Sequence, residues 1–256
     1  MNLATAILIT MFGTAVGSFL NVCIYRLPLR KSLMWPGSHC PACDAPVKPY
    51  DNVPIAGYLW LRGRCRNCRT PISIQYPIVE LVTGLVFLGG YLLFFDSPAM
   101  LVQRLLFACA MIVLFVIDLE HRILPDVITL PGIVIGFVFS VFLPPGWRDS
   151  LIGVVLGGGS LWLIGEAYFR IRHEEGMGFG DVKMLAMIGA FIGWKLMLLT
   201  LVLSSFLGSI VGVAMIVFNR GDMKYALPFG TFLAVGAIIA AAVGDSIVTW
   251  YTAFYY

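Results

Sequence analysis

Residues 176–181 read Gly176-Met177-Gly178-Phe179-Gly180-Asp181, and they lead into an apolar run over residues 182–194. The spaced glycines permit a backbone turn where a side chain would clash. A carboxylate that opens an apolar segment is costly unless a partner, water or a reaction uses its charge, so Asp181 is a candidate functional group. The alternative is that Asp181 simply caps the following helix.

The rest of the chain has the composition of a membrane protein. Of its 256 residues, 59% are hydrophobic and 12% are charged, which leaves too little polar surface for a soluble globule. Apolar runs of about 17 to 25 residues suit helices that cross a bilayer. We therefore expect an all-α polytopic membrane protein, an eight-span helical bundle with spans near residues 3–23, 78–95, 99–117, 127–143, 150–169, 182–194, 196–218 and 225–249.

Three segments follow from this pattern. Residues 1–24 form the first transmembrane span, residues 25–76 form a polar insert, and residues 77–256 form a seven-span membrane core. Of the 17 Lys and Arg residues, all but Arg104, Arg148 and Lys195 fall on one side of the eight spans. Because cytosolic loops carry the excess of basic residues, this side is assigned to the cytosol. The insert, Asp118 and residues 176–181 then share the cytosolic face, and both termini face outward.

Four of the six cysteines form two CxxC pairs within the insert: Cys40 with Cys43, and Cys65 with Cys68. Such paired knuckles place four thiolates around one tetrahedral ion, and the neighbouring arginines favour the deprotonated sulfurs. Four protein ligands leave no open coordination position, so we expect a structural Zn²⁺ that holds the insert's fold and does not activate water. A redox dithiol pair or an unmetallated remnant are the alternatives.

A second acidic stretch lies between the third and fourth expected spans, where Asp118, Glu120 and Asp126 occur within nine residues. Asp126 follows a proline and precedes an apolar run, which is the position of a helix N-cap. Asp118 instead ends a span, where a carboxylate opposes the helix dipole and gains nothing as a cap. Asp118 is therefore the better candidate for chemistry.

Asp118 and Asp181 lie on one membrane face, at the ends of spans that can pack together. An acid pair that shares a proton can activate water with one member and protonate a carbonyl oxygen with the other, as in aspartic proteases. Such a pair titrates as a unit. We expect these two aspartates to form the catalytic site.

Other titratable groups carry weaker signals. For Glu80 and Glu166 we expect pairing with nearby arginines, with direct catalysis as the alternative. His121 and His173 are expected to be solvated loop residues. The sequence contains neither a nucleophile elbow nor a phosphate-binding loop, and nothing in it indicates nucleic-acid binding.

Several motifs together give the chain a family resemblance. These motifs are residues 17–22, 25–28, the two CxxC pairs around residues 50–54, residues 62–66, Tyr76-Pro77 with Glu80, Ile117-Asp118, residues 124–126, residues 176–181 and residues 228–230. With these motifs, in order along nearly the whole chain, the sequence resembles the type IV prepilin peptidases, the bacterial GxGD-type aspartic peptidases.

The resemblance implies two activities on one substrate. The peptidase removes a basic leader from type IV prepilins, or from the pseudopilins of type II secretion, at the cytosolic face of the bacterial inner membrane. The new amino terminus is then N-methylated with S-adenosylmethionine. The family's catalytic aspartates fall on Asp118 and Asp181, and its cysteines fall on Cys40, Cys43, Cys65 and Cys68. The insert and the adjacent loops are where we expect the methyl-donor site.

Two other classes of function remain as alternatives. In a proton- or ion-coupled transporter, the intramembrane acids would relay protons, but acids near the midplane and two related halves are then expected. In a non-enzymatic docking component of a pilus or secretion machine, the insert would bind partners and the bundle would be an anchor. Replacing Asp118 and Asp181 would then leave pilin processing intact.

Overall fold

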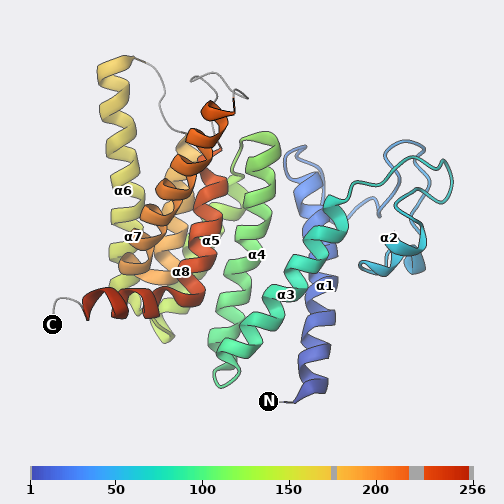
Figure 1. The fold of residues 1–256 in the computed structure, drawn as a ribbon, viewed down its shortest axis with the longest axis horizontal. Helices are drawn as coiled ribbons and strands as arrows, with labels where there is room; N and C mark the ends of the chain where they lie inside the picture. The colour runs from blue at the N-terminus through green and yellow to red at the C-terminus, as the bar shows by residue number, and fades with distance from the viewer. Residues whose placement is uncertain (1, 174–177, 219–227, 254–256) are drawn as a thin grey trace. The chain divides into compact units, whose positions relative to one another are not determined.

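The computed structural model describes residues 2–173, 178–218 and 228–253, and within these residues every regular element is a helix (Figure 1). Gly176 and Met177 of the glycine-rich stretch lie outside the described residues. The expectation of an all-helical membrane protein is confirmed. The elements are α1 (Leu3–Arg26), η1 (Pro49–Asp51), α2 (Ala56–Trp60), α3 (Gln75–Phe94), α4 (Pro98–His121), α5 (Asp126–Phe142), α6 (Trp147–Arg172), α7 (Phe179–Val217) and α8 (Phe229–Thr252).

Six of the described helices are long and apolar enough to cross a membrane, namely α1, α3, α4, α6, α7 and α8. Helix α5 is apolar but shorter, at 17 residues. The 39-residue helix α7 is interrupted at Gly193, whose φ of 77° and ψ of 172° are not helical. This interruption lies beside the boundary expected between spans 182–194 and 196–218.

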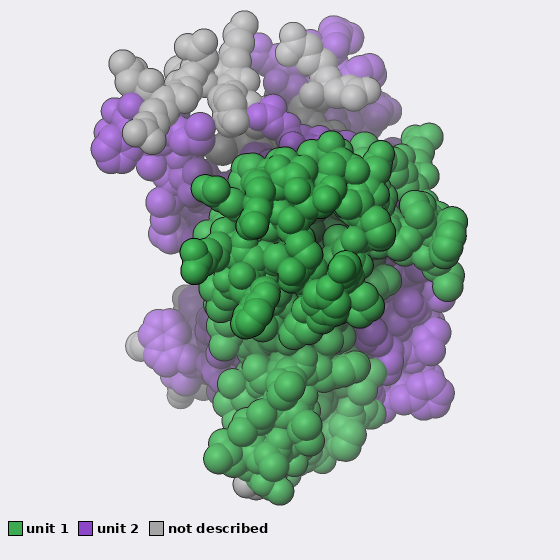
Figure 2. Space-filling model, turned by 90° about the vertical axis from the view of Figure 1, so that its right-hand side faces the viewer, with its two compact units in different colours: residues 1–105 green, residues 106–256 purple. Residues whose placement is uncertain are grey.

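The chain divides into two compact units, residues 1–105 and residues 106–256, which are coloured separately in Figure 2. Unit 1 contains α1, the insert and α3. Here α1 and α3 approach closely because glycines lie at their contact: a Cβ on Gly17 would lie 2.7 Å from the Cα of Glu80. This close approach places Glu80 against the C-terminal half of α1.

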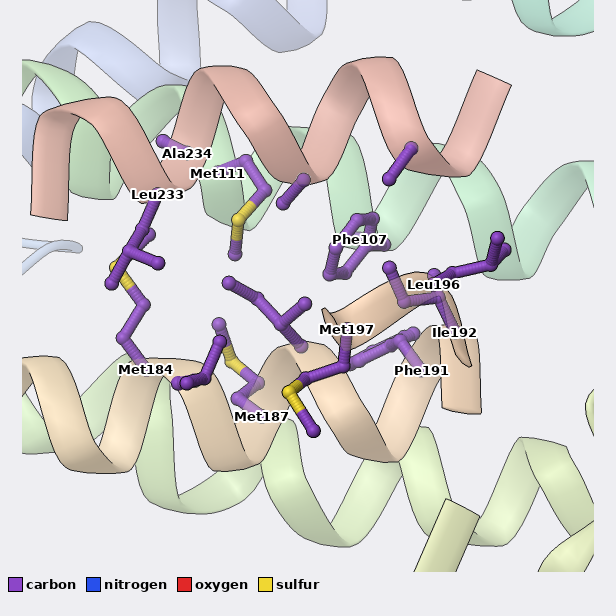
Figure 3. Packing of buried hydrophobic residues seen from close by; sticks show 14 of the residues in the cluster. Phe107, Met111, Met184, Met187, Phe191, Ile192, Leu196, Met197, Leu233 and Ala234 are labelled. Carbon is purple, nitrogen blue, oxygen red and sulfur yellow. The ribbon is translucent and has the colours of Figure 1, made fainter. Parts of the chain in front are cut away.

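Unit 2 has a hydrophobic core built by α4, α6, α7 and α8. Figure 3 shows Phe107 and Met111 of α4 facing Met184 and Met187 of α7, with Leu233 of α8 beside them. Helices α6 and α7 touch through their backbones, since a Cβ on Gly153 would lie 2.5 Å from the carbonyl oxygen of Gly189. This packing fixes the end of α4 that carries Asp118 against the beginnings of α7 and α8.

Candidate active site and metal centre

Asp118 lies in the last turn of α4, and only 5% of its surface is exposed. Its Oδ2 accepts hydrogen bonds from the backbone N–H of Thr231 at 2.7 Å and from the Thr231 hydroxyl at 3.1 Å. Thr231 is the third residue of α8, so its N–H is one of the donors that a helix N-terminus leaves without an intrahelical partner. Asp118 therefore satisfies a donor at the start of α8 across 113 residues of sequence, a partner that the expectation about the end of its own helix did not include.

Asp181 is the third residue of α7 and is partly buried. Its backbone N–H donates to the carbonyl oxygen of Gly178 at 3.1 Å. Gly178 occupies the N-cap position of α7, and no side chain caps this helix there. The Asp181 carboxylate lies close enough to Asp118 for the two charges to interact. No hydrogen bond reaches that carboxylate from the described residues. The two acids thus occupy different environments. The carboxylate of Asp118, at the end of α4, meets the N-terminus of α8, and Asp181 lies in the first turn of α7, and the dipole of a helix N-terminus favours an anion.

Leu124 fills the space between the segments that carry the two acids. A Cβ on Gly180 would lie 2.9 Å from the Cβ of Leu124, and a Cβ on Gly230 would lie 3.0 Å from both Leu124 Cδ1 and Asp118 Oδ2. The glycine before Asp181 and the glycine before Thr231 therefore allow the starts of α7 and α8 to close around one leucine. The second glycine of the Gly178-Phe179-Gly180-Asp181 motif is required sterically.

Asp126 has a different role from the one expected. Pro125 occupies the N-cap position of α5, and Asp126 is the first helical residue. Its carboxylate forms an ion pair with the Nζ of Lys183 at 2.6 Å, which joins the starts of α5 and α7. The N-cap interpretation is wrong because a lysine one turn into α7 offers a better partner than the backbone does.

Glu166 and Glu80 have different kinds of partner. Glu166 pairs with Arg170, four residues later on α6, at 2.8 Å, which confirms the expected pairing. Glu80 forms no ion pair with any described basic residue, so that expectation is wrong. Its Oε2 instead accepts the backbone N–H of Ile55 at 2.7 Å. Two arginines that line the same pocket as Glu80 have other partners, Arg66 with Asp51 and Arg26 with backbone carbonyls.

The four predicted cysteine ligands come together in the insert, where their Sγ atoms all lie within 4.8 Å of one another. The two knuckles have the same backbone pattern. The N–H of Cys40 donates to Ala45 and the N–H of Cys65 donates to Thr70, both at 2.9 Å. The residues that follow Cys43 and Cys68 both adopt positive φ, 54° at Asp44 and 62° at Arg69.

These sulfur positions fit a tetrahedral metal ion. A Zn–S bond of about 2.3 Å implies a separation of about 3.8 Å between sulfurs, and Cys40 Sγ lies 3.7 Å from Cys68 Sγ. The hydrogen bond with the Thr70 hydroxyl lowers the pKa of Cys68 to about 6. The backbone N–H of Cys68 lowers the pKa of Cys65. In the second knuckle the thiolate forms are thus favoured by local hydrogen bonds, whereas the pKa of Cys40 in the first knuckle is raised to about 11.

Comparison of the amino-acid sequence with known proteins identifies the family of this chain. Two family models match, one described as the bacterial peptidase A24 N-terminal domain over residues 11–94 and one as the type IV leader peptidase family over residues 105–213. A protein from Aeromonas hydrophila is named prepilin leader peptidase/N-methyltransferase. It is 36% identical to this chain over an alignment of 271 positions, which covers 95% of this chain and 92% of that protein. This chain belongs to the type IV leader peptidase family.

Other members of the leader peptidase family carry the same name. The protein from Pseudomonas aeruginosa is 35% identical and aligns with 98% of this chain and 95% of its own length. The protein from Myxococcus xanthus is 39% identical over 82% of this chain and 63% of its own length. No solved structure matched the chain. The boundary between the two family matches, residues 94 to 105, lies near the end of unit 1.

Two residues of the site were missed by sequence reasoning. Thr231 follows the Pro228-Phe229-Gly230 motif directly, so that motif was the available signal for its position. Lys183 follows Asp181 by two residues, and nothing in the sequence indicates that it pairs with Asp126. Both contacts join residues more than fifty positions apart.

Proposed function

We infer that this chain is a membrane-bound bifunctional enzyme that removes the leader of prepilins and N-methylates the amino terminus that cleavage exposes. The observation that carries this conclusion is similarity along nearly the full chain to proteins named for both activities. The family expectation for the catalytic pair falls on Asp118 and Asp181, whose carboxylates are close enough to interact in unit 2. This arrangement supports an aspartic peptidase mechanism.

In this mechanism the two carboxylates act on a water molecule without a covalent intermediate. Both hydrogen bonds from Thr231 reach Oδ2 of Asp118, which leaves Oδ1 for water. We assign Asp118 the role of accepting a proton as water attacks the scissile carbonyl carbon, while Asp181 gives its proton to the carbonyl oxygen. When the intermediate collapses, the proton on Asp118 passes to the leaving amine and a hydroxyl proton of the intermediate returns to Asp181.

The proposed topology has eight passes in the bacterial inner membrane with the active site toward the cytosol. The interruption of α7 at Gly193 supports counting that helix as two passes, and α5 supplies a further short one. The strong bias of Lys and Arg toward the side with Asp118 supports the orientation. The substrates we propose are membrane-bound type IV prepilins or type II secretion pseudopilins, presented beside the bilayer lipid.

The four cysteines are proposed to hold one structural Zn²⁺. The sulfur separation and the repeated knuckle backbone support that assignment. With all four positions filled by protein, the ion stabilises the insert and takes no part in hydrolysis. The methyl group for the second reaction comes from S-adenosylmethionine, which supplies an electrophilic methyl on a sulfonium.

Mass spectrometry of the product tests both activities at once. Purified protein in detergent is mixed with a prepilin, with and without S-adenosylmethionine. We expect loss of the leader in both reactions and a further gain of one methyl group only with the donor. A prepilin that keeps its leader would contradict the peptidase assignment, whereas a cleaved product without the methyl group would contradict only the transferase.

A further inference from the structure

The part of the insert between α1 and α3 exposes large apolar side chains. Met34 and Trp35 are 90% and 80% exposed, and Leu59 and Trp60 of α2 are 67% and 80% exposed. Residues 27–74 lie outside the described helices that are long enough to cross a membrane, so contact with lipid along a span does not explain this exposure. These four side chains therefore need another apolar environment.

Helix α2 has an inner side and an outer side. Gly57 is buried, and Tyr58 and Leu61 line the pocket that also contains Glu80. With 3.6 residues per turn, Leu59 and Trp60 lie on the opposite side of the helix. The outer side of α2 is therefore apolar and exposed, although the helix belongs to a polar insert.

A hydrogen bond fixes the depth of α2 relative to α3. The N–H of Ile55, the residue before α2, donates to Oε2 of Glu80 at 2.7 Å. Glu80 is the sixth residue of α3, so it lies about 7.5 Å along the axis from the first residue. The 20 residues of α3 are about 30 Å long, which matches the thickness of a hydrocarbon core. The start of α2 is therefore level with the edge of the hydrocarbon core.

A second contact holds the other tryptophan at the end of α1. Arg26, the last residue of α1, is buried and donates to the carbonyl oxygens of Ser32 at 2.9 Å and Pro36 at 2.6 Å. Met34 and Trp35 lie between these two acceptors, so they are held beside the helix end. Tryptophan is enriched at membrane–water interfaces, where its amphipathic ring meets the headgroups.

The charge of the insert indicates which lipid it meets. Exposed basic residues flank both tryptophans in the sequence, namely Arg30, Lys31, Arg62 and Arg64. Residues 27–74 contain seven Lys or Arg and two Asp, so they stay positive even with the two negative charges of a zinc ion held by four thiolates. This charge complements anionic headgroups and repels the basic leader that the family resemblance implies for prepilins.

We propose that the insert is anchored on the bilayer that the chain crosses. Trp35 and Trp60 enter the boundary between headgroups and acyl chains, and the basic residues beside them bind anionic phospholipid. Amphipathic segments lie about 5–10 Å into this boundary, which agrees with the depth set by Glu80. The proposal goes beyond the two activities, because it makes lipid composition a determinant of where the insert is held.

Tryptophan fluorescence of the purified full-length protein in nanodiscs tests the proposal. Half of the lipid is dibrominated phosphatidylcholine, which quenches tryptophans that contact acyl chains, and the other half is phosphatidylcholine or phosphatidylglycerol. The spectrum of the wild type minus that of Trp60→Phe isolates Trp60, and Trp35→Phe isolates Trp35 in the same way. We expect both signals to be blue-shifted and quenched, and quenching to be stronger with phosphatidylglycerol.

A charge variant tests the role of the anionic headgroups. Each basic residue near an anionic surface favours the bound state by about fivefold, so Arg62→Gln/Arg64→Gln should favour release of the insert by about 30-fold. The effect of phosphatidylglycerol on Trp60, isolated by adding Trp60→Phe to this variant, should then be lost. Arg148→Gln, a matched change in the first turn of α6, should leave the Trp60 signal as in the wild type. Helical content by circular dichroism should be unchanged in every variant.

The outcomes are separate from the proposed activities, because the fluorescence measurement uses no substrate. Red-shifted and unquenched signals from Trp35 and Trp60 in both lipid mixtures would overturn the anchoring. Blue-shifted but unquenched signals would show that a second copy or another protein covers these residues, and would also overturn it. Equal quenching in both mixtures, for the wild type and for Arg62→Gln/Arg64→Gln, would overturn the role of anionic phospholipid.

Discussion

At the scale of single residues, the candidate active site depends on two glycines that stand before two polar side chains. Gly180 precedes Asp181, and Gly230 precedes Thr231, and both lie against Leu124. Gly178, the first glycine of the same motif as Gly180, has only ordinary contact for an added Cβ, 3.7 Å from Asp181 Oδ2. The two motif glycines are therefore not equivalent.

This difference predicts opposite outcomes for two similar substitutions. Gly180→Ala should strongly reduce leader cleavage, because the new Cβ would lie 2.9 Å from the Cβ of Leu124 and displace the start of α7. Gly178→Ala should retain most of the activity. Initial cleavage rates at equal amounts of folded protein give the comparison. Equal loss in both variants would show that the motif's glycines act through something other than Leu124.

Thr231 is predicted to position Asp118 for catalysis. Thr231→Val removes the 3.1 Å hydrogen bond from the hydroxyl and leaves the backbone bond in place. A hydrogen bond to a charged group contributes about 1.5–3 kcal/mol, so we expect kcat to fall by about 10- to 100-fold with little change in KM. Thr231→Ser, which keeps the hydroxyl, should recover most of the rate. A change in KM alone would point to substrate binding instead.

At the scale of elements, the insert is predicted to depend on its metal. Between α1 and α3, residues 27–74 contain only η1 and the five-residue α2 as regular helices, so the knuckles must provide much of the order. Removal of zinc by a chelator, or Cys40→Ala, should make the insert sensitive to trypsin at its arginines.

Cys109→Ala is the matched control for this experiment, because Cys109 lies in α4 outside the knuckles. It should keep one zinc ion per chain by elemental analysis and the wild-type digestion pattern. A protein without zinc that resists trypsin as the zinc-loaded protein does would contradict the structural role of the ion.

Sequence patterns anticipated the elements better than the contacts between them. The two CxxC knuckles were predictable because four ligands follow a local spacing. The interruption of α7 was anticipated by the short apolar run over residues 182–194, and it falls at Gly193. The partners of Asp118, Asp126 and Glu80 were not predictable, because each is chosen by packing between segments far apart in sequence.

At the scale of the whole molecule, the candidate peptidase site and the candidate metal centre belong to different units. Both candidate catalytic aspartates, with Leu124 and Thr231, belong to unit 2, and the four cysteines of the knuckles belong to unit 1. The two family models fall on nearly the same halves of the chain. Membership of the leader peptidase family favours this two-part enzyme over a proton-coupled transporter or a passive anchor. Cleavage and methylation should therefore be separable by substitution.

The most direct test of the account is leader cleavage by Asp118→Asn and Asp181→Asn, with Asp149→Asn as a matched control on α6. Each asparagine keeps the shape of the side chain but can neither accept nor give the catalytic proton. We predict that both variants lose cleavage by on the order of 10²-fold or more. Both should still methylate a pilin supplied without its leader, and Asp149→Asn should cleave normally. Near wild-type cleavage by either Asp118→Asn or Asp181→Asn would contradict the proposed acid–base pair.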